Sequence, residues 1–515
     1  MITATFPQTV APFLSNTTSR YPAQNLTAEQ QKHLAIQMLS GNIPVTELSG
    51  EYQVSRNFLY ELSQKASNGL DNLFFSPDDE ERQKDKKILY YIPVTKSWLD
   101  QVVVALVLLC RSSFRRVMEF FQDILDKSIS IGTVHNIIHK AVSDAQQINS
   151  KQDLSRIKAG SHDELFQSGS PVLTGIDLDS TYCYLLALET HRDADTWGVH
   201  LLDLLAQGLH PNYTIADGGL GLRAGQSIAL PIVPCFGDVF HALYETTKTI
   251  ICLENQAYAS IAKREELEKK MEKAKRHAKG RSFSKQLSVA RYLESILIRV
   301  VDDISLISQW MQKDILAVNE LDFDTRKSMF NFITGELKIL ESLSNIQRIS
   351  KLRIRLENQR DNLLGFATLI DQGLQSISER FQVPVYLLRD VMSLKDQPQT
   401  SQSYYDRINK LHKKLHDKFF VVQQAVILMT ASIHRTSSMV ENLNSRLRDY
   451  FFLRQQIGSS YLDLLRFFFN HHPFTRSEHP ERVGKTPTEL LTGEPHLHWL
   501  ELLGFTLFKR KHNAA

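Results

Sequence analysis

The chain changes its hydrophobic period at about residue 160, and this change limits the folds open to it. From 160 to 243, short runs rich in β-branched and aliphatic residues, such as "PVLTGIDL" and "YCYLLALE", indicate strands. A helix over "DADTWGVHLLDLLAQG", strands over "NYTIADGGLG" and "IALPIVPCFGD", and a helix over "VFHALYETTKTI" follow. Strands followed by alternating helix and strand predict an α/β (α+β) mixed sheet with helices packed on it.

Outside this region the hydrophobic spacing is helical, and 515 residues are too many for one core. We therefore expect several regions. In chain order they are an irregular arm (1–25), an all-α helical region (26–142), the first part of the sheet domain (160–244), a large all-α insertion (245–430), the second part of the sheet domain (431–508) and a basic tail (509–515).

Composition excludes several classes of protein. Hydrophobic residues make up 42% and charged residues 23%, the balance of a globular protein, and the net charge of +3 does not by itself indicate a nucleic-acid binder. The four cysteines form no CxxC pair, which argues against a zinc site or a disulfide framework. The N-terminus lacks signal-peptide features, and the most apolar run, 102–110, is too short to cross a bilayer. We expect a protein of the reducing cytoplasm that does not bind membranes.

Two stretches have a helix-turn-helix outline. In the first, at 45–66, Ser55 would cap a second helix that presents Arg56, Asn57 and Tyr60 to solvent. The second, at 112–141, has an amphipathic helix, a turn and another helix. Either stretch is also compatible with a plain two-helix corner, but two such units in a short span favour nucleic-acid binding.

The insertion contains a basic segment, "AKREELEKKMEKAKRHAKGR", whose first half is balanced by glutamates. A solvated, coiled-coil-like helix face is the simpler interpretation. A phosphate-contacting arm is the alternative.

Three aspartates, Asp163, Asp177 and Asp179, lie in or beside the first strands. The element order resembles the ribonuclease-H-like fold, in which three antiparallel strands, a helix and a fourth strand carry a first acid on strand one and a second at the end of strand four. Asp217, before two glycines in "TIADGG", suits the second position. Roughly 50 residues separate it from Asp163, which is room for three strands and a helix, whereas fewer than about 40 separate it from Asp179. Asp163 is therefore our first choice, with Asp179 and then Asp177 in reserve.

A third acid should lie on a helix that packs against the sheet. In "SSMVENLNSRLR", one polar stripe has i, i+3, i+4 and i+7 spacing, beside an apolar stripe. The polar stripe consists of Glu441, Asn444, Ser445 and Arg448. A polar stripe with a single acid is more often just a solvated helix face. Glu441 is therefore a candidate because it lies on a late helix expected to pack against the sheet, and the stripe itself adds little support.

Five motifs in order resemble bacterial insertion-sequence transposases of the DDE class, over about 40–508: "DELF…GSPVL", "ADGGLGL", "GDVFHALYE", "SSMVENLNSRLR" and "GKTPTELLTG…WLELLGF". The resemblance implies a metal-dependent DNA strand transferase with a helical insertion between the second Asp and the Glu. Its metal ligands would be Asp163, Asp217 and Glu441, holding two Mg²⁺ or Mn²⁺ ions, because hard cations prefer oxygen ligands.

The resemblance also implies roles for other residues. Asp238 and His241 match an Asp-x-x-His pattern, and His241 would either contact DNA near the scissile phosphate or cap and pack its helix. Asn444 and Arg448 would support Glu441 or touch a phosphate. Arg56, Asn57 and Tyr60 become candidates for recognising transposon ends. The partners would be double-stranded DNA, at the nucleoid of the bacterial cytoplasm, and a second copy of the chain in a homodimer or larger assembly.

Other classes of function stay open at this point. A catalytically inactive, domesticated relative would bind DNA as a regulator, and a nuclease of the same fold would cut without joining. A purely structural helical protein with an incidental sheet is the third alternative.

Overall fold

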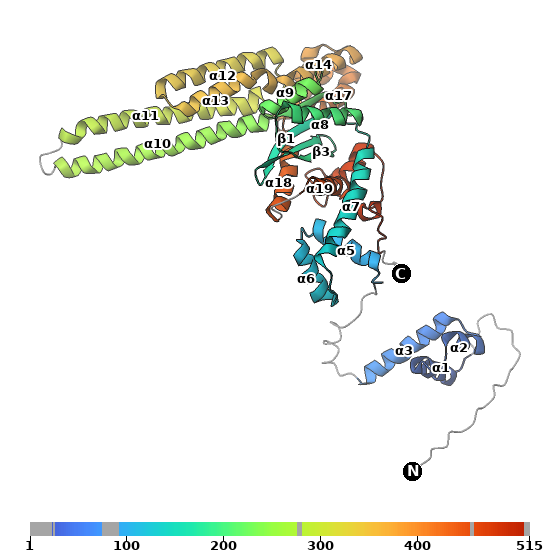
Figure 1. Cartoon of the computed structure of the whole chain (residues 1–515). Coiled ribbons are helices and arrows are strands. Elements are labelled where there is room, and N and C mark those ends of the chain that lie inside the picture. Colours follow the sequence, from blue (N-terminus) through green and yellow to red (C-terminus); the bar gives the residue numbers. More distant parts are fainter. Residues whose placement is uncertain (1–22, 24–25, 75–91, 276–280, 454–457, 509–515) are drawn as a thin grey trace. The chain divides into compact units, whose positions relative to one another are not determined.

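The computed structural model describes residues 23, 26–74, 92–275, 281–453 and 458–508 (Figure 1). The chain divides into two compact units, Met1–Pro93 and Val94–Ala515. The boundary between the two units falls inside residues 26–142, which we predicted to form a single helical region. Nearly all of the predicted arm (1–25) and the whole basic tail (509–515) lie outside the described residues.

The first unit is a three-helix structure made of α1 (Ala28–Ser40), α2 (Val45–Glu51) and α3 (Arg56–Phe74). Its core contains Leu34, Leu48 and Leu59, all fully buried. The backbone N–H of Phe58 donates to the Ser55 hydroxyl at 3.2 Å, which confirms the predicted cap of the second helix in the first helix-turn-helix outline.

The second unit begins with α5 (Lys96–Leu108), α6 (Phe114–Leu125) and α7 (Ile131–Lys151). The helices predicted over 112–141 are therefore present. α7 also runs on to Lys151, past the end of the predicted helical region at residue 142. The reason is long-range packing: the buried Asn149 side chain of α7 donates to the Asp463 carbonyl of α19 (Ser459–His471) at 2.9 Å.

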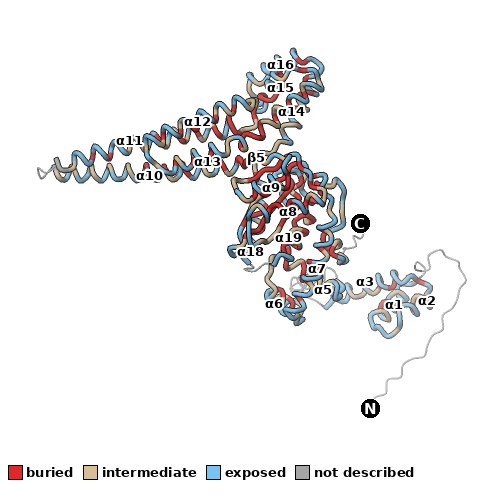
Figure 2. The backbone as a smooth tube through the Cα atoms, turned by 45° about the horizontal axis from the view of Figure 1, so that its top comes forward, coloured by how far each residue is buried: buried red, intermediate tan, exposed pale blue. Residues whose placement is uncertain are grey.

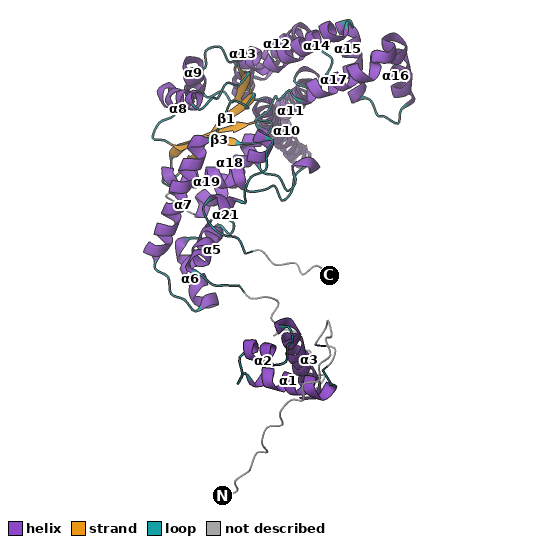
Figure 3. Ribbon diagram, turned by 90° about the vertical axis from the view of Figure 1, so that its right-hand side faces the viewer, coloured by secondary structure: helices purple, strands orange, loops and turns teal. Residues whose placement is uncertain are grey.

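A five-stranded mixed sheet follows (Figure 3). Its strands are β1 (Ala159–Gln167), β2 (Ser170–Asp177), β3 (Cys183–Leu188), β4 (Tyr213–Ala216) and β5 (Cys235–Gly237). They lie in the order β3-β2-β1-β4-β5, with β1–β2 and β2–β3 antiparallel and β1–β4 and β4–β5 parallel. This order agrees with the predicted sequence of three antiparallel strands, a helix and a fourth strand beside the first, and it is consistent with a ribonuclease-H-like fold.

Helices cover both faces of the sheet (Figures 1 and 3). One face packs against α8 (Ala194–Ala206) and α9 (Leu220–Ala229), where Trp197 and Leu222 are fully buried. The other face packs against α7, α18 (Ser438–Leu453) and α19, with Leu165 of β1 in the shared core. Figure 2 shows buried positions in these layers and also along the helices of the insertion.

Helix α9 corrects the prediction of a strand over "IALPIVPCFGD". Ile228 and Ala229 end the helix, and only Cys235–Gly237 pair in the sheet. α8 and α9 approach closely at Gly225, where an added Cβ would lie 2.6 Å from the Cβ of Trp197. The helix that packs on α8 therefore extends into the first two residues of this run, Ile228 and Ala229, whose composition alone is strand-like.

The predicted insertion is helical, and its first two helices form a long pair (Figure 1). The helices are α10 (Val239–Lys275), α11 (Arg281–Trp310), η2 (Met311–Ile315), α12 (Phe323–Ser344), α13 (Gln347–Leu363), α14 (Gly365–Phe381), α15 (Val385–Met392), η3 (Ser393–Asp396), α16 (Gln402–Leu415), η4 (His416–Lys418) and α17 (Phe419–Ala431). Within the basic segment, Arg264 of α10 bonds Glu294 of α11 at 2.8 Å. Charges of this segment therefore hold the pair together, as a coiled-coil-like face would.

After α18 and α19 the chain forms η5 (Pro480–Arg482), α20 (Pro487–Thr492) and α21 (Trp499–Leu502). Over the described residues, no helix combines the length and the apolar character needed to cross a membrane.

Candidate active site

Asp163 and Asp217 occupy neighbouring positions on two adjacent parallel strands. The β1–β4 register ends with the pair His162 and Ala216, so the next residue on each strand is one of the two acids. Adjacent strands lie about 4.8 Å apart, so the two backbones bring the carboxylates to one edge of the sheet. Asp163 lies within β1, whereas Asp217 directly follows the last residue of β4.

Hydrogen bonds orient both carboxylates. Asp163 Oδ1 accepts from the backbone N–H of Glu164 at 2.8 Å, and its Oδ2 accepts from Asn444 Nδ2 of α18 at 2.6 Å. Asp217 Oδ1 accepts from the backbone N–H of Gly219 at 2.7 Å. The predicted support by Asn444, which is almost fully buried, is therefore directed at Asp163.

Glu441 lies in the first turn of α18, the helix that packs against the face of β1 that carries Asp163. Its negative charge acts on Asp163, together with the charges of Asp217 and Asp238. The structure thus brings the three predicted acids into one electrostatic neighbourhood, although more than 200 residues of sequence separate Asp217 from Glu441.

Burial and the nearby carboxylates together raise the pKa of Asp163 to about 7. Burial is the largest cause, the hydrogen bond from Glu164 opposes it, and the charges of Glu441, Asp217 and Asp238 add to it. The pKa shift of Asp163 thus comes from burial and from like charges, whereas Asp217 also interacts electrostatically with the Arg192 guanidinium.

The donor chemistry of the cluster fits a divalent cation. Mg²⁺ and Mn²⁺ prefer carboxylate and amide oxygens, and the buried Asn444 Oδ1, beside Asp163, has no hydrogen-bond partner. As the side chains stand in the described residues, no three His, Cys, Asp or Glu groups surround a single metal position.

Asp177 and Asp179, the reserve candidates for the first acid, lie at another part of the sheet and bond to loop residues. Asp177 pairs with Gly160 in the β1–β2 register, three residues, or about 10 Å, along β1 from Asp163. Its buried Oδ2 accepts from the backbone N–H and the hydroxyl of Ser180, at 2.7 and 2.5 Å. Asp179 is exposed and bonds His434 Nε2 at 2.8 Å, a hydrogen bond that lowers the pKa of Asp179. Both side chains therefore have structural partners.

Asp238 connects two segments that are distant in the sequence. Its Oδ1 accepts from the backbone N–H groups of Phe240, at 2.9 Å, and Ser437, at 3.2 Å, and its Oδ2 accepts from the Ser437 hydroxyl. It thereby joins the start of α10 to the residue before α18. His241, one turn along α10, lines a small recess together with Asp217 and Asp238.

Arg448 lies on the exposed side of α18, in the same stripe as Glu441. A larger cavity, of about 810 Å³, lies at the opposite side of this helix, where Asn442 and Arg446 contribute to its lining. None of the three predicted acids lines that cavity, so its size does not make it the candidate active site.

Arg223 of α9 is a positioning residue that no motif in the sequence indicated. Its guanidinium donates to the carbonyls of Asp217, at 2.9 Å, and Ala216, at 3.1 Å, and to those of Cys235 and Phe236, both at 3.2 Å. It therefore fixes the ends of β4 and β5, including the turn that carries Asp217.

The N-terminal unit presents the predicted DNA-reading residues on one helix. Arg56 and Asn57 are exposed in the first turn of α3, and Tyr60 is 57% exposed. Their neighbours Leu59 and Leu62 are buried in the core of this unit.

A test of the Asp163 environment follows from its raised pKa. Since the folded-state pKa lies above the ordinary value near 3.9, the contribution to stability is complete at low pH and is lost as the pH rises through about 7. Without divalent metal, we expect the wild-type chain to lose about 1–2 kcal/mol more than Asp163→Asn between pH 5 and pH 8, after allowing for solvent screening. Urea unfolding at both pH values measures this difference. Equal losses would contradict the assigned pKa.

Comparison with known proteins adds little to this picture. The chain matches no protein-family model, and no curated protein matches its sequence. Among solved structures, it is similar to the Drosophila P element transposase strand transfer complex, with a TM-score of 0.24 and 14% sequence identity over 83% of this chain and 96% of that chain. That score is too low to support a function, so the sheet order and the positions of the acids carry the assignment below.

Proposed function

We propose that this chain is a DDE-type transposase of the bacterial insertion-sequence kind, which cuts DNA at transposon ends and joins the freed 3′ end to target DNA. The observation that supports this best is the convergence of Asp163 and Asp217, at adjacent positions of a 3-2-1-4-5 sheet, with the helix that carries Glu441. Three oxygen-donor acids from two strands and a returning helix suit phosphodiester chemistry with divalent metal.

In this proposal, the protein positions the reacting groups and balances charge. Two Mg²⁺ or Mn²⁺ ions, if bound, would supply Lewis-acid activation of the attacking water or 3′ hydroxyl and stabilisation of the leaving oxygen. Asp163, Asp217 and Glu441 would hold them. Asn444 holds the Asp163 carboxylate in place, and Arg223 holds the turn at Asp217.

The N-terminal unit would recognise transposon ends through Arg56, Asn57 and Tyr60 in the first turns of α3. Because strand transfer requires two ends to be held together, we expect the active species to be a homodimer or a larger assembly on DNA.

A strand-transfer assay with labelled transposon ends and a supercoiled target tests this function. We expect joined product that depends on Mg²⁺ or Mn²⁺. Hydrolysis without joining would favour a nuclease of the same fold. DNA binding without either product would indicate a regulator that has lost activity.

A further inference from the structure

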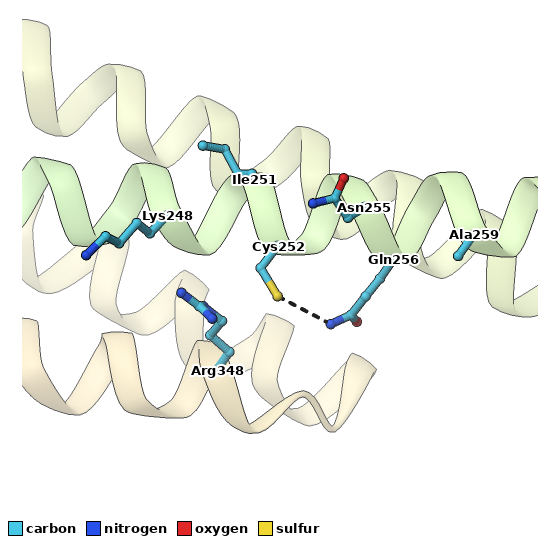
Figure 4. A pocket seen from close by; sticks show the side chains of 7 residues that line it. All are labelled: Lys248, Ile251, Cys252, Asn255, Gln256, Ala259 and Arg348. Atoms are coloured by element: carbon cyan, nitrogen blue, oxygen red, sulfur yellow. Dashed lines mark hydrogen bonds between the residues drawn. The ribbon is translucent and has the colours of Figure 1, made fainter.

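Three recesses follow one another along α10 and α13, starting at the acids. The first is lined by Asp217, Asp238 and His241, and by Arg355 of α13. The second, of about 450 Å³, shares Arg355 with the first. The third, of about 470 Å³, shares Arg348 with the second and is shown in Figure 4. Neighbouring recesses thus share a lining residue, and the three together are called the α10–α13 groove below.

Cations dominate the lining of the groove beyond the acids. Lys248 lies on the α10 side, and Arg348, Lys351 and Arg355 lie on the α13 side. Among the lining residues of the second and third recesses, the one carboxylate is Glu245, which bonds Lys248 at 3.2 Å and Arg355 at 3.4 Å. The lining thus keeps a net positive charge.

Arg348 and Lys351 have no carboxylate partner among the described residues, and both are exposed. Figure 4 shows Lys248 and Arg348 projecting from the two helices into the same space. Arg348 and Lys351, the two cations without a carboxylate partner, lie on the same face of α13 as the paired Arg355. The stability of the helix does not explain them, because like charges on one face repel each other.

The spacing of the cations suits a polymer of phosphates. Arg348, Lys351 and Arg355 have i, i+3 and i+7 spacing, so they share one face of α13 over about 10 Å. Successive phosphates of one DNA strand advance about 3.4 Å along the duplex axis, so this face is long enough for about three of them. The groove is shallow, and its remaining lining includes the neutral side chains of Asn255 and Gln256. These features favour an extended backbone over a small enclosed anion.

We propose that the α10–α13 groove binds the phosphate backbone of the DNA duplex whose scissile bond lies at Asp163, Asp217 and Glu441. This inference rests on the proposed function, since it assigns a DNA-binding role to the helical insertion of the same enzyme. The contact is independent of base sequence, because every side chain invoked is a cation that meets phosphate.

The test measures binding of the full-length chain to a labelled 30-base-pair duplex by fluorescence anisotropy, in EDTA and over a series of salt concentrations. For Arg348→Gln/Lys351→Gln, we expect the slope of log K against log salt to fall by about 2, since each lost phosphate contact removes about 0.9. At low salt the affinity should fall about 10-fold or more.

Arg299→Gln/Lys338→Gln is the matched control, since it removes the same charge from exposed positions of α11 and α12 that do not line the groove. It should keep the wild-type slope. Thermal unfolding checks that both double variants remain folded, and Lys351→Glu alone should lower the affinity further than Lys351→Gln.

Omitting divalent metal separates this inference from the catalytic proposal. If the groove variant binds DNA with the wild-type slope, or if the control weakens binding equally, the groove is not a DNA contact, whatever the cleavage assay shows. If the groove variant alone loses affinity while the wild-type chain makes no cleaved or joined product, the groove assignment holds and the transposase assignment fails.

Discussion

Asp217→Asn is expected to reduce Mg²⁺-dependent cleavage of labelled transposon ends by at least about 10³-fold, a loss of about 4 kcal/mol of transition-state stabilisation. The substitution keeps an oxygen that can accept from the backbone N–H of Gly219, so the turn after β4 should persist while the charge is lost. Asp163→Asn and Glu441→Gln should have effects of the same size. Binding to DNA in EDTA should change little for all three variants, because none of these acids supplies a contact to phosphate.

Asp179→Asn is the control for this prediction. Asp179 is exposed and bonded to His434, so cleavage should stay within a few-fold of wild type. Activity that survives Asp163→Asn but disappears with Asp179→Asn would show that the first acid had been assigned to the wrong strand.

Asp238→Ala is expected to lower the free energy of unfolding by about 3 kcal/mol and to abolish most cleavage. Removing the buried carboxylate leaves the backbone N–H groups of Phe240 and Ser437 and the Ser437 hydroxyl without their acceptor. The segment before α18 then loses its link to the start of α10, and Glu441 lies four residues after Ser437. Urea unfolding and the cleavage assay measure the two effects.

Asp238→Asn distinguishes positioning from charge. Asparagine keeps one acceptor oxygen, so it should restore most of the stability and much of the activity. If Asp238→Asn is as inactive as Asp217→Asn while it unfolds like the wild type, then Asp238 acts directly on the metal or the DNA, and the positioning role is wrong.

The sequence predicted those parts of the fold that depend on local pattern. The change of period at residue 160 predicted the strands, and the number of residues between Asp163 and Asp217 predicted which aspartate lies on β1. The end of α9 was assigned to a strand because "IALPIV" has the composition of a strand, whereas the buried positions of the helix, including Leu222 and Ala229, follow a helical spacing.

Contacts between distant segments could not be predicted in the same way. Arg223 acts through four backbone carbonyls, and any residue type supplies a carbonyl, so no sequence signal marks its role. Similarly, the hydrogen bond between Asp238 and Ser437 joins residues about 200 positions apart. It depends on the path of the chain through the insertion and back to the sheet, which no local pattern in the sequence predicts.

The position of the insertion has a consequence for the newly made protein. β5 and the two aspartates leave the ribosome about 200 residues before α18, which at ordinary translation speed is about 10–40 s. During that interval the nascent chain holds a sheet with two acids and lacks the third. In the proposed transposase, the set of three acids is therefore completed only when about the last seventh of the polypeptide is made.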